Sequence, residues 1–97
     1  MIYVVNAVGT ADEKCPIDYD SWIDFWEKKT RKKASFCRHC GKRTNELCGG
    51  HVQIVEKHTD NKWYRTSKKF IVPLCIKCNN SENNTIFKVD ENDLVAV

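Results

Sequence analysis

Two short stretches, CRHC at residues 37–40 and CIKC at residues 75–78, decide how this chain folds. Each is a Cys-x-x-Cys pair, and the tight turn of such a pair can present two sulfurs to one ion. Zinc prefers four thiolate or imidazole ligands in a tetrahedron, so the two pairs supply a complete set. We therefore expect one structural Zn²⁺ that joins two distant segments of the chain. Its ligands would be Cys37, Cys40, Cys75 and Cys78.

The residues that follow the first pair offer a competing site. Cys48 and His51 could complete it as a Cys-x-x-Cys, Cys-x-x-His set. That set would leave the pair at residues 75–78 idle at a matching spacing, so we favour the four-cysteine site. Two complete zinc sites are not expected, because they would need nearly every Cys and His in the chain.

The size and composition of the chain are those of a small soluble protein. Its 97 residues predict a single domain, because a second independent core would bury too little apolar surface. No stretch approaches the roughly 20 apolar residues of a membrane span, and the opening MIYVVNAVG does not resemble a signal peptide. We therefore expect a cytoplasmic protein, and in that reducing compartment six cysteines indicate metal binding or catalysis before disulfides. A secreted protein with three disulfides is the alternative, if an export signal has been removed.

Positive charge is concentrated beside the first cysteine pair. Residues 1–27 hold six acidic residues and one basic residue, whereas residues 28–43 hold eight basic residues and no acid. Such a block can contact nucleic-acid phosphates, but basic residues near a helix C-terminus also suit the helix dipole. The sequence leaves both explanations open. The block consists of Lys28, Lys29, Arg31, Lys32, Lys33, Arg38, Lys42 and Arg43.

The chain before residue 35 predicts a strand and a helix. β-branched and aromatic residues over 2–8 predict the strand. Asp18 or Asp20 can cap a helix that runs to about residue 33, with acids in its first turn and bases in its last. Trp22, Phe25 and Trp26 are spaced i, i+3, i+4 and share one helix face, which we expect to form core.

The rest of the chain predicts a small α+β domain assembled around the zinc. We expect strands at about residues 51–55 and 70–74, a short helix at 75–84, and strand segments at 85–89 and 94–97. Trp63 and Tyr64 could form an extra strand between the first two. One domain over residues 1–97 would then comprise an N-terminal strand and helix (1–34), a zinc-bound core (35–84) and closing strand segments (85–97).

Residues 37–42, two cysteines on a tight turn followed by glycine, have the form of a zinc knuckle. The order of this knuckle, a strand, a loop, a strand and a helix is that of a treble-clef finger. More narrowly, CxxC at residues 37–40, GGHV at 49–52 and IVPLCxxCN at 71–79 resemble the zinc-stapled HNH endonucleases of the ββα-metal superfamily. The resemblance covers about residues 35–84 and implies a ββα core held by structural zinc. It also implies a second, catalytic divalent ion, Mg²⁺ or Mn²⁺, between the first strand and the helix.

The resemblance assigns roles to two residues. His51 matches the family's general base, which takes a proton from the water that attacks the phosphodiester. Asn79 occupies the position of the family's last histidine and could ligate the second metal through its side-chain oxygen. The family's middle asparagine would fall near Lys69 or Phe70, so it is missing.

The family's metal-binding aspartate is also missing, because Gly50 precedes His51. Mg²⁺ would thereby lose its only charged protein ligand in this constellation. Glu82, one helical turn beyond the second cysteine pair, could in principle replace it. Gly49 and Gly50 are expected to give flexible backbone that makes room for the knuckle. The motif is therefore catalytically degenerate, and His51 is expected to hydrogen-bond the loop.

Three functions follow from these observations. The first is a nucleic-acid-binding module, for DNA rather than RNA, that uses the basic block and Arg65, Lys68 and Lys69. Trp63 and Tyr64 could stack on bases, but core packing explains them equally well. The second is an active metal-dependent HNH endonuclease that uses His51. The third is a phage- or mobile-element-encoded accessory or inhibitor protein that binds a larger protein or nucleoprotein. We expect no membrane partner and no small-molecule substrate.

Overall fold

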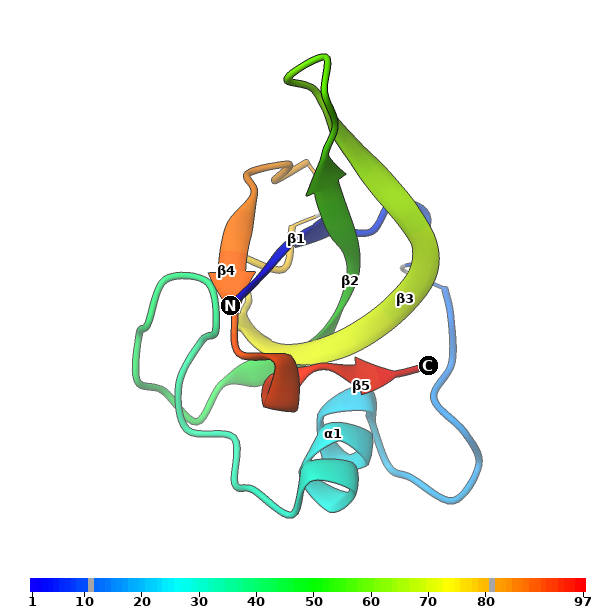
Figure 1. Ribbon diagram of the computed structural model, residues 1–97. Helices are drawn as coiled ribbons and strands as arrows, with labels where there is room; N and C mark the ends of the chain where they lie inside the picture. The colour runs from blue at the N-terminus through cyan, green and yellow to red at the C-terminus, as the bar shows by residue number, and fades with distance from the viewer. Residues whose placement is uncertain (11, 81) are drawn as a thin grey trace.

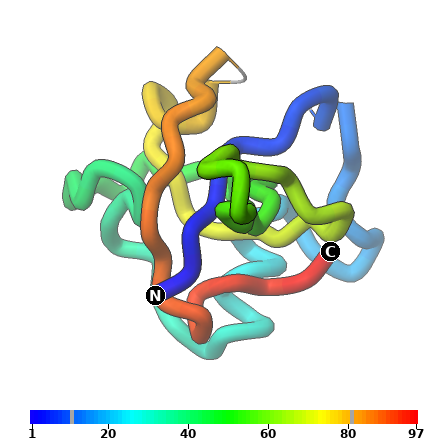
Figure 2. The backbone as a smooth tube through the Cα atoms, turned by 45° about the horizontal axis from the view of Figure 1, so that its top comes forward, coloured from blue at the N-terminus to red at the C-terminus, as the bar shows by residue number. Residues whose placement is uncertain are grey.

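The computed structural model describes residues 1–10, 12–80 and 82–97, and it shows an α+β domain with a five-stranded antiparallel sheet (Figure 1). Within these residues there is one α-helix. The sheet order is β4-β1-β2-β3-β5, and Figure 2 shows β4 running beside β1. The elements are β1 (Ile2–Asn6), α1 (Trp22–Thr30), β2 (Leu47–Lys57), β3 (Trp63–Cys75), β4 (Phe87–Val89), a 3₁₀ turn (Glu91–Asp93) and β5 (Val95–Ala96).

A long hairpin of β2 and β3 is the centre of the sheet. The two strands pair from Leu47 opposite Cys75 at one end to Lys57 opposite Trp63 at the other. The register shifts once, between Gln53 and Val55, where β3 runs through more residues than β2. Such an irregularity bends a strand, and Figure 1 shows β3 curving strongly. The strands predicted at 51–55 and 70–74 both lie within this hairpin, the second at the end of β3. The predicted extra strand at residues 63–64 is the start of β3.

The helix α1 is shorter than predicted. Ser21 caps it, in place of Asp18 or Asp20: the Ser21 hydroxyl accepts from the Asp24 N–H at 3.1 Å. Arg31 ends it in the left-handed conformation (φ 60°). Of the predicted aromatic face, Phe25 and Trp26 are buried, which confirms that it forms core.

Hydrophobic residues gather in two clusters on the two faces of the sheet. The larger cluster includes three of the four paired cysteines and the inward residues of four strands, among them Val4, Val52, Val72, Leu74, Phe87 and Val89. The smaller joins α1 to β3 through Phe25, Trp26 and Ile71. Ile71 and Val72 are neighbours in β3 and point to opposite faces, so this strand belongs to both clusters.

The helix predicted at residues 75–84 is wrong for the described part of that segment. Residues 76–79 form a single turn, closed by the Asn79 N–H donating to the Cys75 carbonyl at 2.9 Å. The side chain of Asn6 donates to the Cys78 carbonyl at 2.7 Å, so an acceptor that a helix would use is occupied. The Asn80 and Asn83 side chains accept from backbone N–H groups two residues ahead, which also favours turns over helix.

The last element of the ββα order is therefore not formed in the described residues. The remaining boundaries differ less from the prediction. The first strand ends at Asn6 rather than residue 8, and the closing segments shrink to β4 and β5. No helix among the described residues is long and apolar enough to cross a membrane.

Candidate metal centre and neighbouring pocket

The four paired cysteines come together, although their two pairs lie far apart in the chain. The sulfurs of Cys37, Cys40, Cys75 and Cys78 all lie within 4.8 Å of one another. Those of Cys40 and Cys75 are 3.8 Å apart, close to the about 3.8 Å that a tetrahedral ion with Zn–S bonds of about 2.3 Å imposes. All six cysteines are free of disulfides. The cluster suggests a zinc-binding site and is consistent with a structural Zn²⁺.

Two turns hold these sulfurs in place. Gly41, at φ 79°, lets the first pair turn back so that its N–H donates to the Cys37 carbonyl at 2.9 Å. The second pair lies at the end of β3 and in the turn at 76–79. The Arg38 N–H donates to the Pro73 carbonyl at 2.9 Å, so the two segments are also joined by backbone.

The electrostatics of the cluster favour a bound cation. Burial opposes ionisation of Cys37, but backbone N–H groups of Cys40, Cys75 and His39 point at its sulfur and lower its pKa to about 7. Burial raises the pKa of Cys78, and hydrogen bonds with the neighbouring thiols act in the same direction. Four thiolates this close cannot all be charged without a cation among them. A complete Cys₄ set has no open coordination position, so a zinc here would stabilise the fold.

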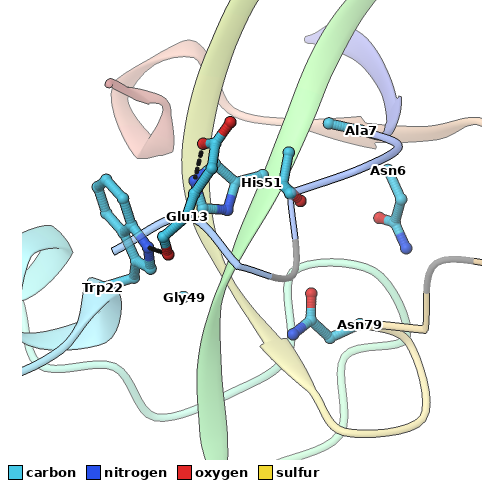
Figure 3. Close-up of a pocket in the computed structure, with 8 residues that line it drawn as sticks. Asn6, Ala7, Glu13, Trp22, Gly49, His51 and Asn79 are labelled. Carbon is cyan, nitrogen blue, oxygen red and sulfur yellow. Dashed lines mark hydrogen bonds and ion pairs between the residues drawn. The ribbon is translucent and has the colours of Figure 1, made fainter. Parts of the chain in front are cut away.

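The competing ligand set is not formed. Cys48 lies opposite Leu74 in the hairpin, outside the cysteine cluster. The imidazole of His51 faces Glu13 instead of a sulfur (Figure 3). Cys48 and His51 are three positions apart in β2, so they point to opposite faces of the strand.

A pocket of about 350 Å³ lies between the loop that follows β1 and the strand β2 (Figure 3). It contains both residues to which the resemblance assigns a role, His51 and Asn79. The His51 side chain is buried, and the ring of Trp22 meets it edge-on at 4.7 Å. The lining residues are Asn6, Ala7, Thr10, Glu13, Trp22, Gly49, His51 and Asn79.

Glu13 brings a carboxylate into this pocket from outside the region of resemblance. Its Oε2 lies 3.2 Å from His51 Nε2, and its Oε1 lies 2.8 Å from Lys69 Nζ. Trp22 Nε1 donates to the Glu13 carbonyl at 3.0 Å. The predicted substitute, Glu82, does not line the pocket. Sequence patterns could not reveal Glu13, because it lies in an irregular loop far from His51 in the chain.

The protonation states of Glu13 and His51 follow from their surroundings. The hydrogen bond from Lys69 holds the pKa of Glu13 below its ordinary value, so the carboxylate is charged. Burial lowers the pKa of His51 despite the nearby Glu13 charge, so its imidazole is neutral at pH 7. A neutral imidazole beside a carboxylate can accept a proton.

Two buried polar atoms at the pocket lack hydrogen-bond partners in the described chain. They are Asn6 Oδ1 and His51 Nε2, whose contact with Glu13 has the distance but not the alignment of a hydrogen bond. Leaving buried polar atoms unpaired costs about 1–3 kcal/mol each. The pocket is therefore suited to a polar or ionic ligand.

The two glycines of β2 are required by close packing rather than by flexibility. A Cβ on Gly49 would lie 2.5 Å from the backbone carbon of Trp22. A Cβ on Gly50 would meet Leu74 Cδ1 and would lie 2.7 Å from Asn79 Oδ1. A side chain at the position of the family's aspartate would therefore have to displace the ends of the Leu74 and Asn79 side chains.

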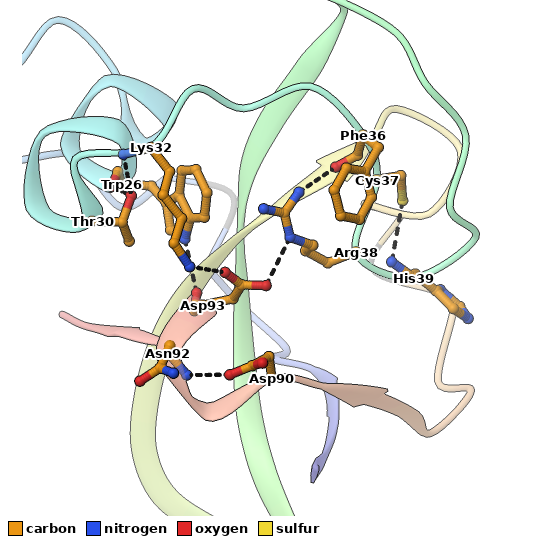
Figure 4. A network of polar contacts seen from close by, with 10 residues as sticks. All are labelled: Trp26, Thr30, Lys32, Phe36, Cys37, Arg38, His39, Asp90, Asn92 and Asp93. Atoms are coloured by element: carbon orange, nitrogen blue, oxygen red, sulfur yellow. Dashed lines mark hydrogen bonds and ion pairs between the residues drawn. The ribbon is translucent and has the colours of Figure 1, made fainter.

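The predicted basic block is not one free surface. The Arg38 side chain is 8% exposed, and its guanidinium lies over Phe36 (3.8 Å to the ring centre) and 3.0 Å from Asp93 Oδ2 (Figure 4). Lys32 Nζ lies 2.9 Å from the other Asp93 oxygen. Burial alone would raise the pKa of Asp93, but these two cations lower it.

Three residues of the block are therefore engaged in ion pairs, since Lys28 also pairs with Asp24 at 3.0 Å. The Asp93 network stabilises the contact between α1 and the knuckle, because Trp26 Nε1 donates to the Asp93 carbonyl at 2.8 Å. The remaining five basic residues of the block have no carboxylate within 4 Å in the described chain and are exposed. They are Lys29, Arg31, Lys33, Lys42 and Arg43.

No protein-family model, no curated protein and no solved structure matches this chain. The resemblance to HNH endonucleases therefore rests on the motifs alone.

Proposed function

We propose that this protein is a zinc-stapled nucleic-acid-binding module. The observation that carries the proposal is the placement of its unpaired positive charge. Of the sixteen Lys and Arg residues, four form ion pairs in the described chain; the other twelve have no carboxylate within 4 Å, and all twelve are exposed. Four of the twelve lie in the β2–β3 hairpin, Lys57, Lys62, Arg65 and Lys68, and a fifth, Lys88, lies in β4 of the same sheet.

Exposed ammonium and guanidinium groups without a carboxylate partner can bind phosphates by displacing condensed counterions, although Arg65 also donates to the Asn6 carbonyl and to Gln53. The hairpin is also poor in competing acids. Between residues 57 and 69 there is one, Asp60, and its carboxylate accepts from the Tyr64 hydroxyl. The resemblance to HNH proteins, a treble-clef family that acts on nucleic acid, supports the same class of ligand. In this proposal zinc maintains the shape of the module and does not contact the ligand.

The test is a salt titration of binding. Fluorescence anisotropy with short DNA and RNA oligonucleotides should show affinity falling by tenfold or more between about 50 and about 200 mM salt. The pair Lys57→Glu and Lys88→Glu should weaken binding strongly. The matched pair Lys33→Glu and Lys42→Glu, with the same change of net charge, should weaken it less. Absence of binding at low salt would reject the proposal and favour the accessory-protein hypothesis.

A second candidate function is metal-dependent phosphodiester cleavage in the pocket. It is favoured by one specific observation: His51, Asn79 and the Glu13 carboxylate line the same cavity. Carboxylate and amide oxygens are ligands for Mg²⁺ or Mn²⁺, and neutral His51 could take the proton of an attacking water.

Incubation of supercoiled plasmid with Mg²⁺, Mn²⁺ or Ni²⁺ tests this second candidate. Nicking that His51→Ala and Glu13→Gln abolish, while Lys33→Ala retains it, would support cleavage. Intact plasmid in every metal would exclude it and leave the binding function unaffected.

A further inference from the structure

One face of the sheet carries an aromatic pair that core packing does not explain. Tyr3 of β1 and Trp63 of β3 lie with ring centres 5.2 Å apart and planes inclined at 48°. Tyr3 is 38% exposed and Trp63 is 39% exposed, and neither belongs to a hydrophobic cluster of the core. Large aromatic side chains left at the surface are typical of binding sites.

Each ring of this pair is accompanied by a lysine. Lys57 Nζ lies 6.0 Å from the centre of the Trp63 ring, and Lys88 Nζ lies 5.4 Å from that of Tyr3. In both cases the lysine and the aromatic residue are cross-strand partners, so all four side chains share one face of the sheet. Neither lysine has a carboxylate within 4 Å in the described chain.

Tyr64, the residue predicted to act with Trp63, lies on the opposite face. Successive residues of a strand point to opposite sides, and the Tyr64 ring stacks on His58 at 4.2 Å. The aromatic partner of Trp63 is therefore Tyr3, which is distant in sequence but near in the sheet.

The same face continues along the hairpin to the pocket. The partners Val55 and Arg65, and then Gln53 and Lys69, lead from Lys57 to His51. Six residues of strand span roughly 20 Å. Arg65 is exposed, and Lys69 reaches Glu13 at the edge of the pocket. This face of the sheet thus connects the aromatic pair Tyr3 and Trp63 to the polar pocket, with Arg65 and Lys69 between them.

We propose that this face binds single-stranded nucleic acid, with unpaired bases stacked on Tyr3 and Trp63 and phosphates held by Lys57 and Lys88. In a duplex each base is already stacked on its neighbours, so the broad face of a protein ring is available only to unpaired bases. Lysine chains are long and mobile, and they can move from a ring to a phosphate at little cost. The inference rests on the proposed nucleic-acid-binding function and adds the strandedness of the ligand and its site.

The test compares the zinc-loaded full chain with three aromatic variants. Its probes are a short single-stranded DNA, the RNA of the same sequence and the DNA duplex. We expect single strands to bind more tightly than the duplex. Trp63→Ala and Tyr3→Ala should each weaken single-strand binding about tenfold, the loss of one base stack. Tyr64→Ala is the matched control, because it removes an exposed ring from the other face of the same strand. It should leave binding unchanged.

The outcomes separate this inference from the proposed function. Duplex binding equal to or tighter than single-strand binding, or no effect of Trp63→Ala, would overturn the inference and leave nucleic-acid binding standing. No binding to any of the three probes would overturn both. Trp63→Phe keeps a stacking ring and should retain most of the affinity, which excludes misfolding as the cause of the alanine effect. The DNA and RNA arms show which single strand is preferred.

Discussion

The two ends of the β2–β3 hairpin differ in almost every physical property, although the same backbone ladder runs through both. We call residues 47–52 and 70–75 the hairpin base, and residues 56–65 the hairpin tip. The base ends at Cys75 of the cysteine cluster and contains the close-packed Gly49 and Gly50. Its residues His51, Ile71 and Leu74 are buried. Every residue of the tip is exposed.

The difference shows how one element can serve two purposes. At the base, side chains are held by the cysteine cluster, close packing and ion pairs, so we expect few substitutions to be tolerated. At the tip, the strand pair is maintained by backbone hydrogen bonds and by exposed side-chain contacts such as the Tyr64–His58 stack, so the side chains stay accessible to solvent. Substitutions should therefore affect stability at the base and binding at the tip.

Loss of the metal should have the largest effect, and it should act through the base. Structural zinc sites contribute about 10–16 kcal/mol in apparent binding energy, as much as the whole stability of a small domain. Chelation, or Cys75→Ser, should abolish cooperative unfolding in circular dichroism, with the zinc content measured in parallel. Cys15→Ser, outside the cluster, is the control. An unchanged melting temperature after chelation would contradict a structural zinc.

The next largest effect should follow from Asp93→Asn. This change leaves the buried guanidinium of Arg38 without its carboxylate, and we expect a loss of about 2–3 kcal/mol in the free energy of unfolding. Asp24→Asn removes an exposed ion pair with Lys28 and should cost much less, because water screens that pair. Urea unfolding of the two variants measures the contrast. Equal losses would show that the Arg38 contact is no stronger than a surface pair.

Gly50→Ala tests whether the glycines of the base serve close packing. The new methyl group would meet buried Leu74 and the Asn79 side chain, and we expect a loss of about 2 kcal/mol. Gly41 has a positive φ but open space around it, so Gly41→Asn should cost less than about 1 kcal/mol. Thermal unfolding distinguishes the two. A neutral Gly50→Ala would mean that the base is more loosely packed than described here.

The pH dependence of stability should report on His51. Burial lowers its pKa in the folded chain below that of the unfolded chain, so the unfolded state binds more protons at acidic pH. Stability is therefore unaffected well above the ordinary histidine pKa of about 6.5, and it falls as the pH drops below that value towards the lowered pKa of the folded chain. Glu13 and Lys69 are the charged groups that face the ring. His51→Gln should flatten the curve of unfolding free energy against pH; a curve parallel to the unmodified protein would contradict this.

The smallest effect on stability is expected at the tip. Trp63 is 39% exposed and its ring lies beside the exposed residues Tyr3 and Lys57, so Trp63→Ala should cost about 1 kcal/mol or less. The same variant should lower single-strand affinity about tenfold. A loss of more than about 2 kcal/mol would show that the aromatic pair stabilises the fold, and that the tip resembles the base in this respect.

Sequence reasoning succeeded where the relevant residues are close together in the chain. The spacing within each cysteine pair predicts two sulfurs on one turn, and the spacing of Phe25 and Trp26 predicts a buried helix face. Both patterns depend on local backbone geometry, which the sequence expresses directly. The α+β class follows from the same periodicities.

It failed where a distant residue changes the local outcome. Residues 75–84 have the pattern of a helix start, but Asn6 takes the Cys78 carbonyl. The block at 28–43 reads as one basic surface, but Asp93 draws Lys32 and Arg38 into a network (Figure 4). In each case the deciding partner comes from the opposite end of the chain.

By itself, the sequence determined the turn geometry of the two Cys-x-x-Cys pairs, the amphipathic helix and the strand-rich class, because their signals are spacings of a few residues. Only the tertiary structure decided that Cys48 and His51 stay outside the cysteine cluster and that Glu13 supplies the carboxylate of the pocket. It also decided that Tyr3 is the aromatic partner of Trp63. These contacts depend on strand register and sheet order. Both arise from the summed packing of the whole sheet, so no short stretch of sequence specifies them.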